Sequence, residues 1–479
     1  MSTPRKQPYH LPPGLPHALP FYTFKKWVKL GDPIRLFEHL HKTYGNIAHY
    51  RFMGTPIVFL NHPDYIREVL VTQSSSFVKE RTVRRMKVLL GEGLITSDDP
   101  IHIRQRRIAA PAFHRQRIAA YADQIVALAA AQRDRWLPGQ TIDIAAASMQ
   151  LSLEIVARTL FDTEVTADIR AINDEVNTVM GLYNFLVAFP KLESFINLPI
   201  PGLIKFRRSK AHLDAVVNRL VAERRAEINA GAPDKGDLLH MLLTSTDSDS
   251  ESPSDGMSPD QIRDEVLTIF LAGYETVANA LTWTWYLLSQ HPEIEAKLHA
   301  ELNTVLGNRL ATLADYPNLR YTEQIFAESM RLYPPAWAMG RMSTKPVTLG
   351  PYTLPPGSHV FFSQYIMGHT PEYFPDPLRF DPDRFTPEAK AARPKYTYFP
   401  FGGGSRQCIG ESFAWMEGTL ALATIAQRWS PRFIPTYPIV LQPKITLRPK
   451  NPVMMHLQPR ESTPYTSHKN CHPERSAKH

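Results

Sequence analysis

Cysteine is scarce in this chain, which has only Cys408 and Cys471 among its 479 residues. Two cysteines cannot build a disulfide framework, so we expect a reducing compartment, the cytoplasm. The first twenty residues contain six prolines and no long apolar run, which argues against a signal peptide and against a membrane anchor. These features predict a cytoplasmic protein without a membrane anchor.

Signatures of several enzyme classes are also absent. The chain has no Walker loop and no G-x-G-x-x-G motif after a strand, so we expect no fused nucleotide or flavin module. No H-E-x-x-H motif indicates zinc, and no G-x-S-x-G elbow indicates a hydrolase. The 54 Lys and Arg residues exceed the 46 Asp and Glu residues without forming a run, so we expect no nucleic acid partner. If the chain is a redox enzyme, its electrons must come from a separate protein.

The order of the patterns predicts one large domain between two irregular ends. Residues 1–20 are interpreted as a Pro-rich arm and residues 21–459 as a single domain. Residues 460–479 are polar and almost lack bulky apolar side chains, which predicts a disordered tail. Cys471 lies in that tail, so Cys408 is the one cysteine of the predicted domain.

Helical patterns dominate the domain, and short strands occur near both of its ends. Ser258 and Gln261 form a capping box with Pro259 at the first helical position, which predicts a long helix that continues to His291-Pro292. Residues 73–99 are interpreted as an irregular connection that opens with a Ser-rich stretch. The other expected elements are helices over 32–45, much of 104–290 and 322–332, a hairpin of 47–52 with 57–60, and short strands within 347–362.

The most specific pattern is F-x-x-G-x-R-x-C-x-G, which runs from Phe401 to Gly410. Cys408 lies there on a glycine-rich loop before an apolar helical stretch, where backbone N–H groups and the helix dipole are expected to lower the thiol pKa. Such a thiolate is a ligand for haem iron. Gly404 and Gly410 would let the backbone approach a flat macrocycle. Arg406 would direct a cation at a haem propionate.

This pattern resembles the cysteine-ligand loop of the cytochrome P450 family, and the resemblance extends over residues 32–458. It implies a mainly α fold with a large helical part and a small β-rich part. Haem b would be buried between a long central helix and the cysteine loop. Cys408 would bind the iron, and Phe401 would pack beside the sulfur.

A second motif of the family, Ala272-Gly273-Tyr274-Glu275-Thr276, lies inside the predicted long helix. Thr276 can bond back to the carbonyl of Ala272 and open the helix there. Gly273 would leave room for dioxygen, so both Ala272 and Gly273 would line the haem. Glu275 and Thr276 would supply an acid and a hydroxyl for proton delivery.

Two further groups of residues match the family. Glu328 and Arg331 share a helix face and would pair with Arg384 to support the cysteine loop. The residues that match propionate partners are His102, Arg106, Arg341 and Arg406.

The resemblance implies a monooxygenase that inserts one oxygen atom from O2 into an apolar or amphipathic small molecule, such as a fatty acid, terpenoid or steroid. Electrons would come from a ferredoxin- or flavodoxin-type protein with its reductase, attracted by a basic face near the cysteine loop. We expect a monomer. The candidate substrate contacts, for which a core role is an equal alternative, are residues 86–90, 182–187, 269–270 and 336–339.

Alternatives stay open at this point. A peroxide-dependent haem-thiolate enzyme is disfavoured by the intact Glu275–Thr276 pair, and a haem-based ligand sensor by the lack of a regulatory module. Residues 180–206 would serve substrate entry or touch a membrane surface, and the first is favoured. His369 would be a structural histidine rather than a second axial ligand.

Overall fold

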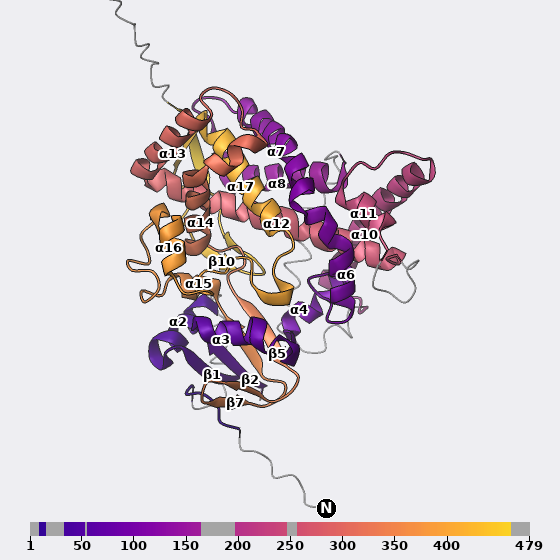
Figure 1. The fold of residues 1–479 in the computed structure, drawn as a ribbon, viewed down its shortest axis with the longest axis vertical. Coiled ribbons are helices and arrows are strands. Elements are labelled where there is room, and N and C mark those ends of the chain that lie inside the picture. The colour runs from indigo at the N-terminus through magenta and orange to yellow at the C-terminus, as the bar shows by residue number, and fades with distance from the viewer. Residues whose placement is uncertain (1–8, 16–32, 53–54, 164–196, 247–255, 461–479) are drawn as a thin grey trace, which may run out of the picture.

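A small sheet-rich part and a large helical part lie at opposite ends of the molecule's long axis (Figure 1). The computed structural model describes residues 9–15, 33–52, 55–163, 197–246 and 256–460. Most of the expected arm, residues 461–479 of the expected tail and the candidate contact 182–187 lie outside the described residues.

A mixed five-stranded sheet forms the smaller part. Its strands lie in the order β1 (Ile47–Phe52), β2 (Thr55–Leu60), β8 (His359–Phe362), β5 (Met339–Ser343) and β3 (Phe77–Lys79). β2 and β8 run parallel, and the other neighbours are antiparallel. The hairpin predicted from β1 and β2 is therefore confirmed. The last pairing sets Lys79 directly opposite Arg341.

The prediction of an irregular connection over residues 73–99 is wrong in part. The segment contains a 3-10 turn η2 (Ser74–Ser76), strand β3, and the short helices α4 (Arg81–Arg85) and α5 (Lys87–Leu90). Elements of three to five residues are too short to show a periodic pattern. Strand β3 exists because it pairs with β5, which comes much later in the chain.

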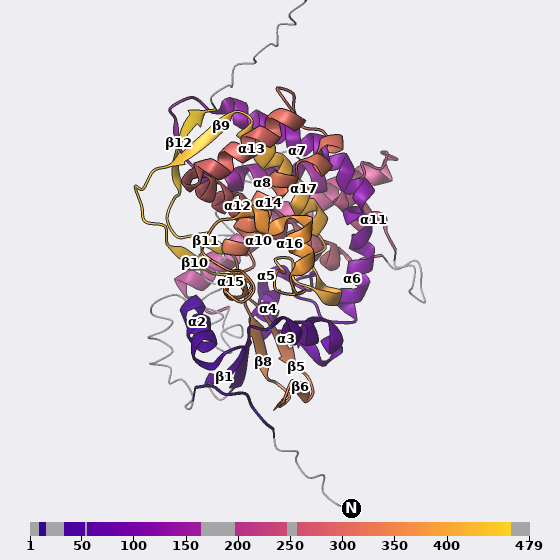
Figure 2. The same cartoon turned by 60° about the vertical axis from the view of Figure 1, so that its left-hand side comes forward.

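The helical part is organised around the long helix α12 (Pro259–Gln290), which crosses it in both views (Figures 1 and 2). The predicted capping box is present: the Gln261 N–H donates to Ser258 Oγ, and the Ser258 N–H donates to Gln261 Oε1. Helix α8 (Ile144–Phe161) packs along α12, and α17 (Glu411–Ala426) contacts the same helix. These helices carry or support most of the predicted site.

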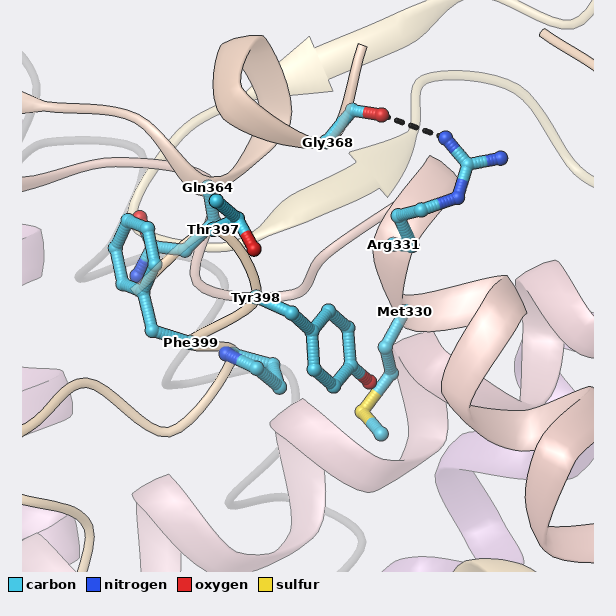
Figure 3. A pocket seen from close by; sticks show the side chains of 8 residues that line it. Met330, Arg331, Gln364, Gly368, Thr397, Tyr398 and Phe399 are labelled. Carbon is cyan, nitrogen blue, oxygen red and sulfur yellow. Dashed lines mark hydrogen bonds between the residues drawn. The ribbon is translucent and has the colours of Figure 1, made fainter. Parts of the chain in front are cut away.

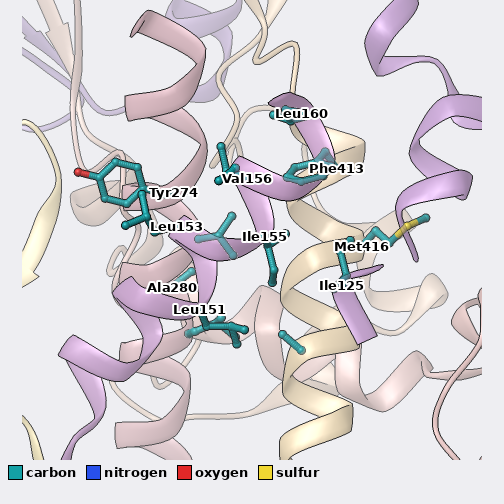
Figure 4. Close-up of a cluster of buried hydrophobic side chains, with 14 of the residues drawn as sticks. Ile125, Leu151, Leu153, Ile155, Val156, Leu160, Tyr274, Ala280, Phe413 and Met416 are labelled. Atoms are coloured by element: carbon teal, nitrogen blue, oxygen red, sulfur yellow. The ribbon is translucent and has the colours of Figure 1, made fainter. Parts of the chain in front are cut away.

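Apolar side chains of α8 fill the space between α12 and α17 (Figure 4). Val156 and Leu153 come from α8, Tyr274 from α12, and Phe413 and Met416 from α17; all are buried. Their burial is favourable because apolar surface leaves water. This core fixes the two helices that flank the candidate site relative to each other.

The other elements cover this core and extend the sheet-rich part. The remaining helices and helical turns are α2 (Pro33–Tyr44), α3 (Pro63–Arg67), η1 (Glu68–Thr72), α6 (Ile101–Ala109), η3 (Ala110–Phe113), α7 (Arg115–Arg135), α10 (Pro201–Asn229), α11 (Leu238–Thr244), α13 (Pro292–Val305), η5 (Leu313–Asn318), α14 (Arg320–Leu332), α15 (Gln364–Gly368), η6 (Pro382–Phe385), α16 (Pro387–Ala392) and η7 (Gly404–Arg406). The remaining strands are β4 (Thr141–Asp143), β6 (Val347–Leu349), β7 (Tyr352–Leu354), β9 (Trp429–Phe433), β10 (Leu441–Pro443), β11 (Leu447–Pro449) and β12 (Met454–Pro459).

Helix α8 is, among the described residues, the one helix whose length and composition would suit a membrane span. Its mean hydropathy is 1.3, and 61% of it is buried inside the protein. A central helix of a large core has the same composition, because both of its faces meet apolar neighbours.

Candidate active site

Cys408 lies on a loop that is tied to the start of α17. Its backbone N–H donates to the carbonyl oxygen of Phe401 at 2.9 Å. The Phe401 ring packs on Trp415 of α17, with 5.6 Å between ring centroids. The loop backbone is therefore fixed, while the Cys408 side chain stays accessible.

The expectation that this loop lowers the Cys408 pKa is wrong. Burial raises the pKa of the thiol to about 11; the Gly410 N–H and the Arg106 guanidinium act in the opposite direction but do not offset it. The Cys408 side chain is accessible, yet protein atoms surround it closely enough that desolvation raises the pKa of its thiol. A thiol in such surroundings becomes a thiolate when a metal ion binds it, since a coordinating thiol is deprotonated outright.

The glycines of the loop serve different purposes. Gly404 has φ +70°, and a Cβ there would lie 2.0 Å from the carbonyl oxygen of Leu70. Glycine is required at this position by the backbone of η1, so the expected reason, close approach to a macrocycle, is not needed to explain it. A Cβ on Gly410 would make ordinary contacts with Phe113 and the Cys408 sulfur at 3.8 and 4.0 Å.

The motif on α12 has the predicted local geometry at its threonine. The Thr276 hydroxyl donates to the carbonyl oxygen of Ala272 at 2.7 Å. Gly273 also has a packing role: a Cβ there would lie 3.1 Å from Cγ2 of Val156 on α8. The close packing of α8 on α12 therefore favours glycine at this position, and room for dioxygen stays a prediction.

Glu275 has a partner that the sequence does not indicate. The Thr446 hydroxyl, in the turn between β10 and β11, donates to Glu275 Oε1 at 2.5 Å. Glu275 and Thr276 are neighbours in the chain, but Thr276 bonds to the backbone of α12 and Glu275 bonds to the β10–β11 turn.

Three predicted propionate partners gather in one cluster of cations. Arg406 lies 3.3 Å from Asp99 and 3.6 Å from Asp98, and it donates to the carbonyl oxygen of Ser97 at 3.1 Å. His102 is buried and lies 3.5 Å from Asp99. Arg341 and Arg406 line one pocket together with Ser405.

The electrostatics of this cluster indicate a deficit of negative charge. Burial and the neighbouring Arg406 lower the pKa of Arg341 to about 10. Burial and the charge of Lys79 lower the pKa of His102 to about 4. Such shifts arise when buried cations outnumber their anions, so a ligand with carboxylates would stabilise the charged forms.

Lys79 belongs to the same cluster and was missed by sequence reasoning. Its ammonium group donates to the carbonyl oxygens of Leu94 and Ile95, the latter at 2.6 Å. Burial, followed by Arg406 and Arg341, lowers its pKa to about 7. The one sequence feature that could have indicated Lys79 is the strand-like run Phe77–Lys79, and three residues are too few to predict a strand.

Arg106 stands apart from this cluster and faces the cysteine loop. Its guanidinium donates to the carbonyl oxygen of Gln407 at 2.7 Å, next to Cys408. The i,i+4 spacing of His102 and Arg106 on α6 is confirmed, but the two side chains have different partners. Together, an accessible thiol and a cluster of cations that outnumber their anions fit a metal-containing dicarboxylate such as haem.

The predicted support group is assembled as expected. Arg331 donates to both carboxylate oxygens of Glu328, at 2.6 and 2.7 Å, and both side chains are fully buried. Arg384 lies 3.5 Å from the same carboxylate. Arg331 also donates to the carbonyl oxygen of Gly368 at 2.6 Å, the bond drawn in Figure 3.

This buried charge group holds the segment that leads into the cysteine loop. Figure 3 shows Tyr398 beside Met330 of α14, and the Tyr398 hydroxyl donates to the carbonyl oxygen of Ala327 at 3.0 Å. The segment 397–400 lines a pocket with Met330 and Arg331. Helix α14 therefore supports the backbone that precedes Phe401.

Two other expectations can be compared with the structure. His369 stacks on Tyr365 and its Nδ1 lies 2.7 Å from that residue's carbonyl oxygen, which confirms a structural histidine. Trp337, a candidate substrate contact, is buried against Phe37 and donates to the carbonyl oxygen of Lys444 at 2.8 Å. Its interactions are those of a core residue.

Comparison with known proteins places this geometry in a family. The sequence profile described as Cytochrome P450 matches residues 12–456. The chain is 37% identical to cyclooctatin synthase of Streptomyces melanosporofaciens, over 87% of this chain and 89% of that one. It is 36% identical to cyclooctat-9-en-7-ol 5-monooxygenase of the same organism, over 82% and 84%. The retinoic acid-bound structure of cyanobacterial CYP120A1 superposes with a TM-score of 0.81 at 23% identity, over 95% of this chain and 100% of that one.

Proposed function

Since this chain belongs to the cytochrome P450 family, it is a haem-thiolate monooxygenase, and we propose that Cys408 is its iron ligand and that its substrate is a cyclic terpenoid. The observation that carries the first assignment is the accessible Cys408 side chain on a fixed loop at the start of α17. The second rests on the relative named for its action on cyclooctat-9-en-7-ol, a cyclic unsaturated alcohol.

The haem would supply the oxygen chemistry when bound, and side chains of this protein would hold it in place. Arg341, Arg406 and Lys79 would hold the propionates, because they belong to a cluster in which cations outnumber anions. His102 would be a further hydrogen-bond donor beside them, and their carboxylates would favour its charged form, which burial and Lys79 disfavour by lowering its pKa to about 4. Arg106 steadies the cysteine loop through the carbonyl of Gln407.

Proton delivery is the task of the acid and the hydroxyl on α12. Glu275 supplies the carboxyl group, and Thr276 Oγ1 passes the proton on, with its resting hydrogen bond to Ala272 replaced during transfer. Apolar residues of the core keep bulk water away, among them Phe270, which packs on Phe161 at 5.7 Å between ring centroids.

Electrons come from a separate protein, and we propose an acidic ferredoxin or flavodoxin. Arg107 of α6 and Arg115 at the start of α7 are exposed. They lie close to the cysteine loop, because Arg106 contacts Gln407 and Phe113 lies beside Gly410. Opposite charge on the partner would speed association. The cytoplasm, where such carriers are found, is the proposed location, and a monomer the proposed state.

Reconstitution with a ferredoxin, its reductase, NADPH and O2 tests the proposed function. A cyclic terpenoid alcohol should shift the haem absorption spectrum, bind more tightly than a fatty acid, and gain the mass of one oxygen atom. Arg107→Glu with Arg115→Glu should raise the KM for ferredoxin about tenfold at low salt and less at high salt. Lys42→Glu, an exposed change on α2, should leave that KM unaltered. Turnover of fatty acids alone would refute the substrate class, and equal KM values would refute the docking face.

A further inference from the structure

The turn between β10 and β11 is attached to α12 at three points one helical turn apart. The Thr446 hydroxyl donates to Glu275 Oε1 at 2.5 Å, and the Asn279 amide donates to Thr446 Oγ1 at 3.3 Å. One turn further, the Trp283 indole donates to the carbonyl oxygen of Leu447 at 3.0 Å. Positions 275, 279 and 283 share one helix face, so the hairpin lies along this face.

The far side of the hairpin is anchored as well. The Trp337 indole donates to the carbonyl oxygen of Lys444 at 2.8 Å, and the Leu447 N–H donates to the carbonyl oxygen of Pro335 at 2.9 Å. The turn that carries Thr446 is therefore held between α12 and the chain that follows α14. It offers Glu275 a partner whose own position is fixed.

We propose that Thr446 is a positioning residue that sets the Glu275 carboxylate for proton delivery. A threonine hydroxyl has one proton to donate and can also accept. Asn279 occupies an acceptor position of Thr446, which leaves the proton for Glu275. Thr446 and Asn279 are both buried, with 6% and 3% exposure, so water does not readily replace this bond.

The consequence is a division of tasks between neighbouring residues. Thr276 bonds to the backbone of its own helix, whereas Glu275 is directed to the hairpin. Glu275 therefore lies next to Thr276 in the chain without a hydrogen bond to its hydroxyl, and the hairpin fixes the position of the Glu275 carboxylate oxygens. This inference rests on the proposed role of Glu275 as the proton source.

A purely structural role for the hairpin contact is the rival explanation, and Trp283 provides the matched control. Its bond to Leu447 joins the same hairpin to the same helix two turns away from Glu275. Trp283→Phe removes this bond and leaves the Glu275 contact in place. If attachment of the hairpin were all that mattered, Trp283→Phe and Thr446→Val would have the same effect.

The test measures how electrons divide between product and hydrogen peroxide in the reconstituted holoenzyme. Thr446→Val keeps the shape and removes the hydroxyl, so the ratio of product to peroxide should fall about tenfold, the effect of one hydrogen bond to a charged group. Thr446→Ser should restore the ratio. Substrate affinity, from the spectral shift, should stay within about twofold in both variants, and a crystal structure of Thr446→Val should show a displaced Glu275 carboxylate.

Each remaining outcome contradicts a definite part of the account. Unchanged coupling in Glu275→Gln would reject the proposed acid, and this inference with it. Uncoupling in Glu275→Gln but not in Thr446→Val would reject only the inference. It would also be rejected if Thr446→Ser uncoupled as strongly as Thr446→Val, or if Trp283→Phe did so. Any variant that loses the spectrum of the reduced carbon monoxide complex is misfolded, and the milder Thr446→Ala then replaces Thr446→Val.

Discussion

Single residues of the site show how burial and charge compete. Cys408 lies where a helix dipole favours a thiolate, yet burial dominates and raises its pKa to about 11. Lys79 shows the same effect with the opposite sign, because burial lowers its pKa to about 7. Both shifts favour the neutral form of the group. An iron dicarboxylate ligand would stabilise the charged form of each, the iron for the Cys408 thiolate and the carboxylates for the Lys79 ammonium. The charged forms of these groups therefore lack sufficient partners of opposite charge, which the cofactor would supply.

A different buried acid allows a prediction about pH. Glu417 of α17 is fully buried and accepts a hydrogen bond from the Ser152 hydroxyl of α8. Burial raises its pKa to about 8. The folded protein therefore holds this proton at pH values where the unfolded chain has lost it. The stability that results is complete below about pH 4.5 and is lost as pH rises toward 8.

Glu417→Gln should remove this dependence, because a glutamine resembles the protonated acid and does not titrate. Between pH 5 and 8, the variant should gain stability relative to the wild type by up to about 4 kcal/mol. Urea unfolding followed by circular dichroism measures the difference at each pH. Glu388→Gln, at an exposed position of α16, should show no such trend. A constant difference for Glu417→Gln would mean that the buried carboxyl is ionised.

Elements differ in how well the sequence predicted them. The capping box at Ser258 predicted the start of α12 correctly, since a local hydrogen-bond pattern determines it. Strand β3 was missed because its existence depends on pairing with the distant β5. For the same reason the sequence did not indicate Lys79, which reaches the cluster only through that pairing. Nor could it indicate that Thr446 would meet Glu275, since the contact joins distant segments.

The buried group of Glu328, Arg331 and Arg384 connects α14 to the segment before the cysteine loop, and its two arginines differ in how many bonds they make. Arg331 makes two bonds to Glu328 and three to backbone carbonyls, whereas Arg384 lies 3.5 Å from the same carboxylate. Arg331→Lys keeps the charge but cannot form these bonds together. It should cost about 3–5 kcal/mol, as expected for a disrupted buried pair, and the protein should lose haem.

The matched change Arg384→Lys should cost less than half as much, because Arg384 is at the edge of the group. Thermal unfolding and the haem content of the purified variants measure both effects. Equal losses of stability and haem in the two variants would show that Arg331 contributes no more than Arg384 to this buried group.

For the whole molecule, the sequence predicted the fold class and the family. The order of the motifs, from Ala272 through Glu328 to Cys408, indicated a mainly α fold with a small sheet, and the comparisons confirm the family. The contacts between motifs needed the folded chain. Arg406 approaches Asp99 from a segment far along the chain, and no periodic pattern records such a contact.

The central claim is that the Cys408 sulfur holds the haem iron, and one spectrum tests it most directly. The reduced protein with carbon monoxide should show the absorption band of a thiolate ligand, and Cys408→His should bind haem but lose that band. Cys471→Ser should keep it. A thiolate band that survives in Cys408→His, or is missing from the wild type with a full complement of haem, would contradict the account.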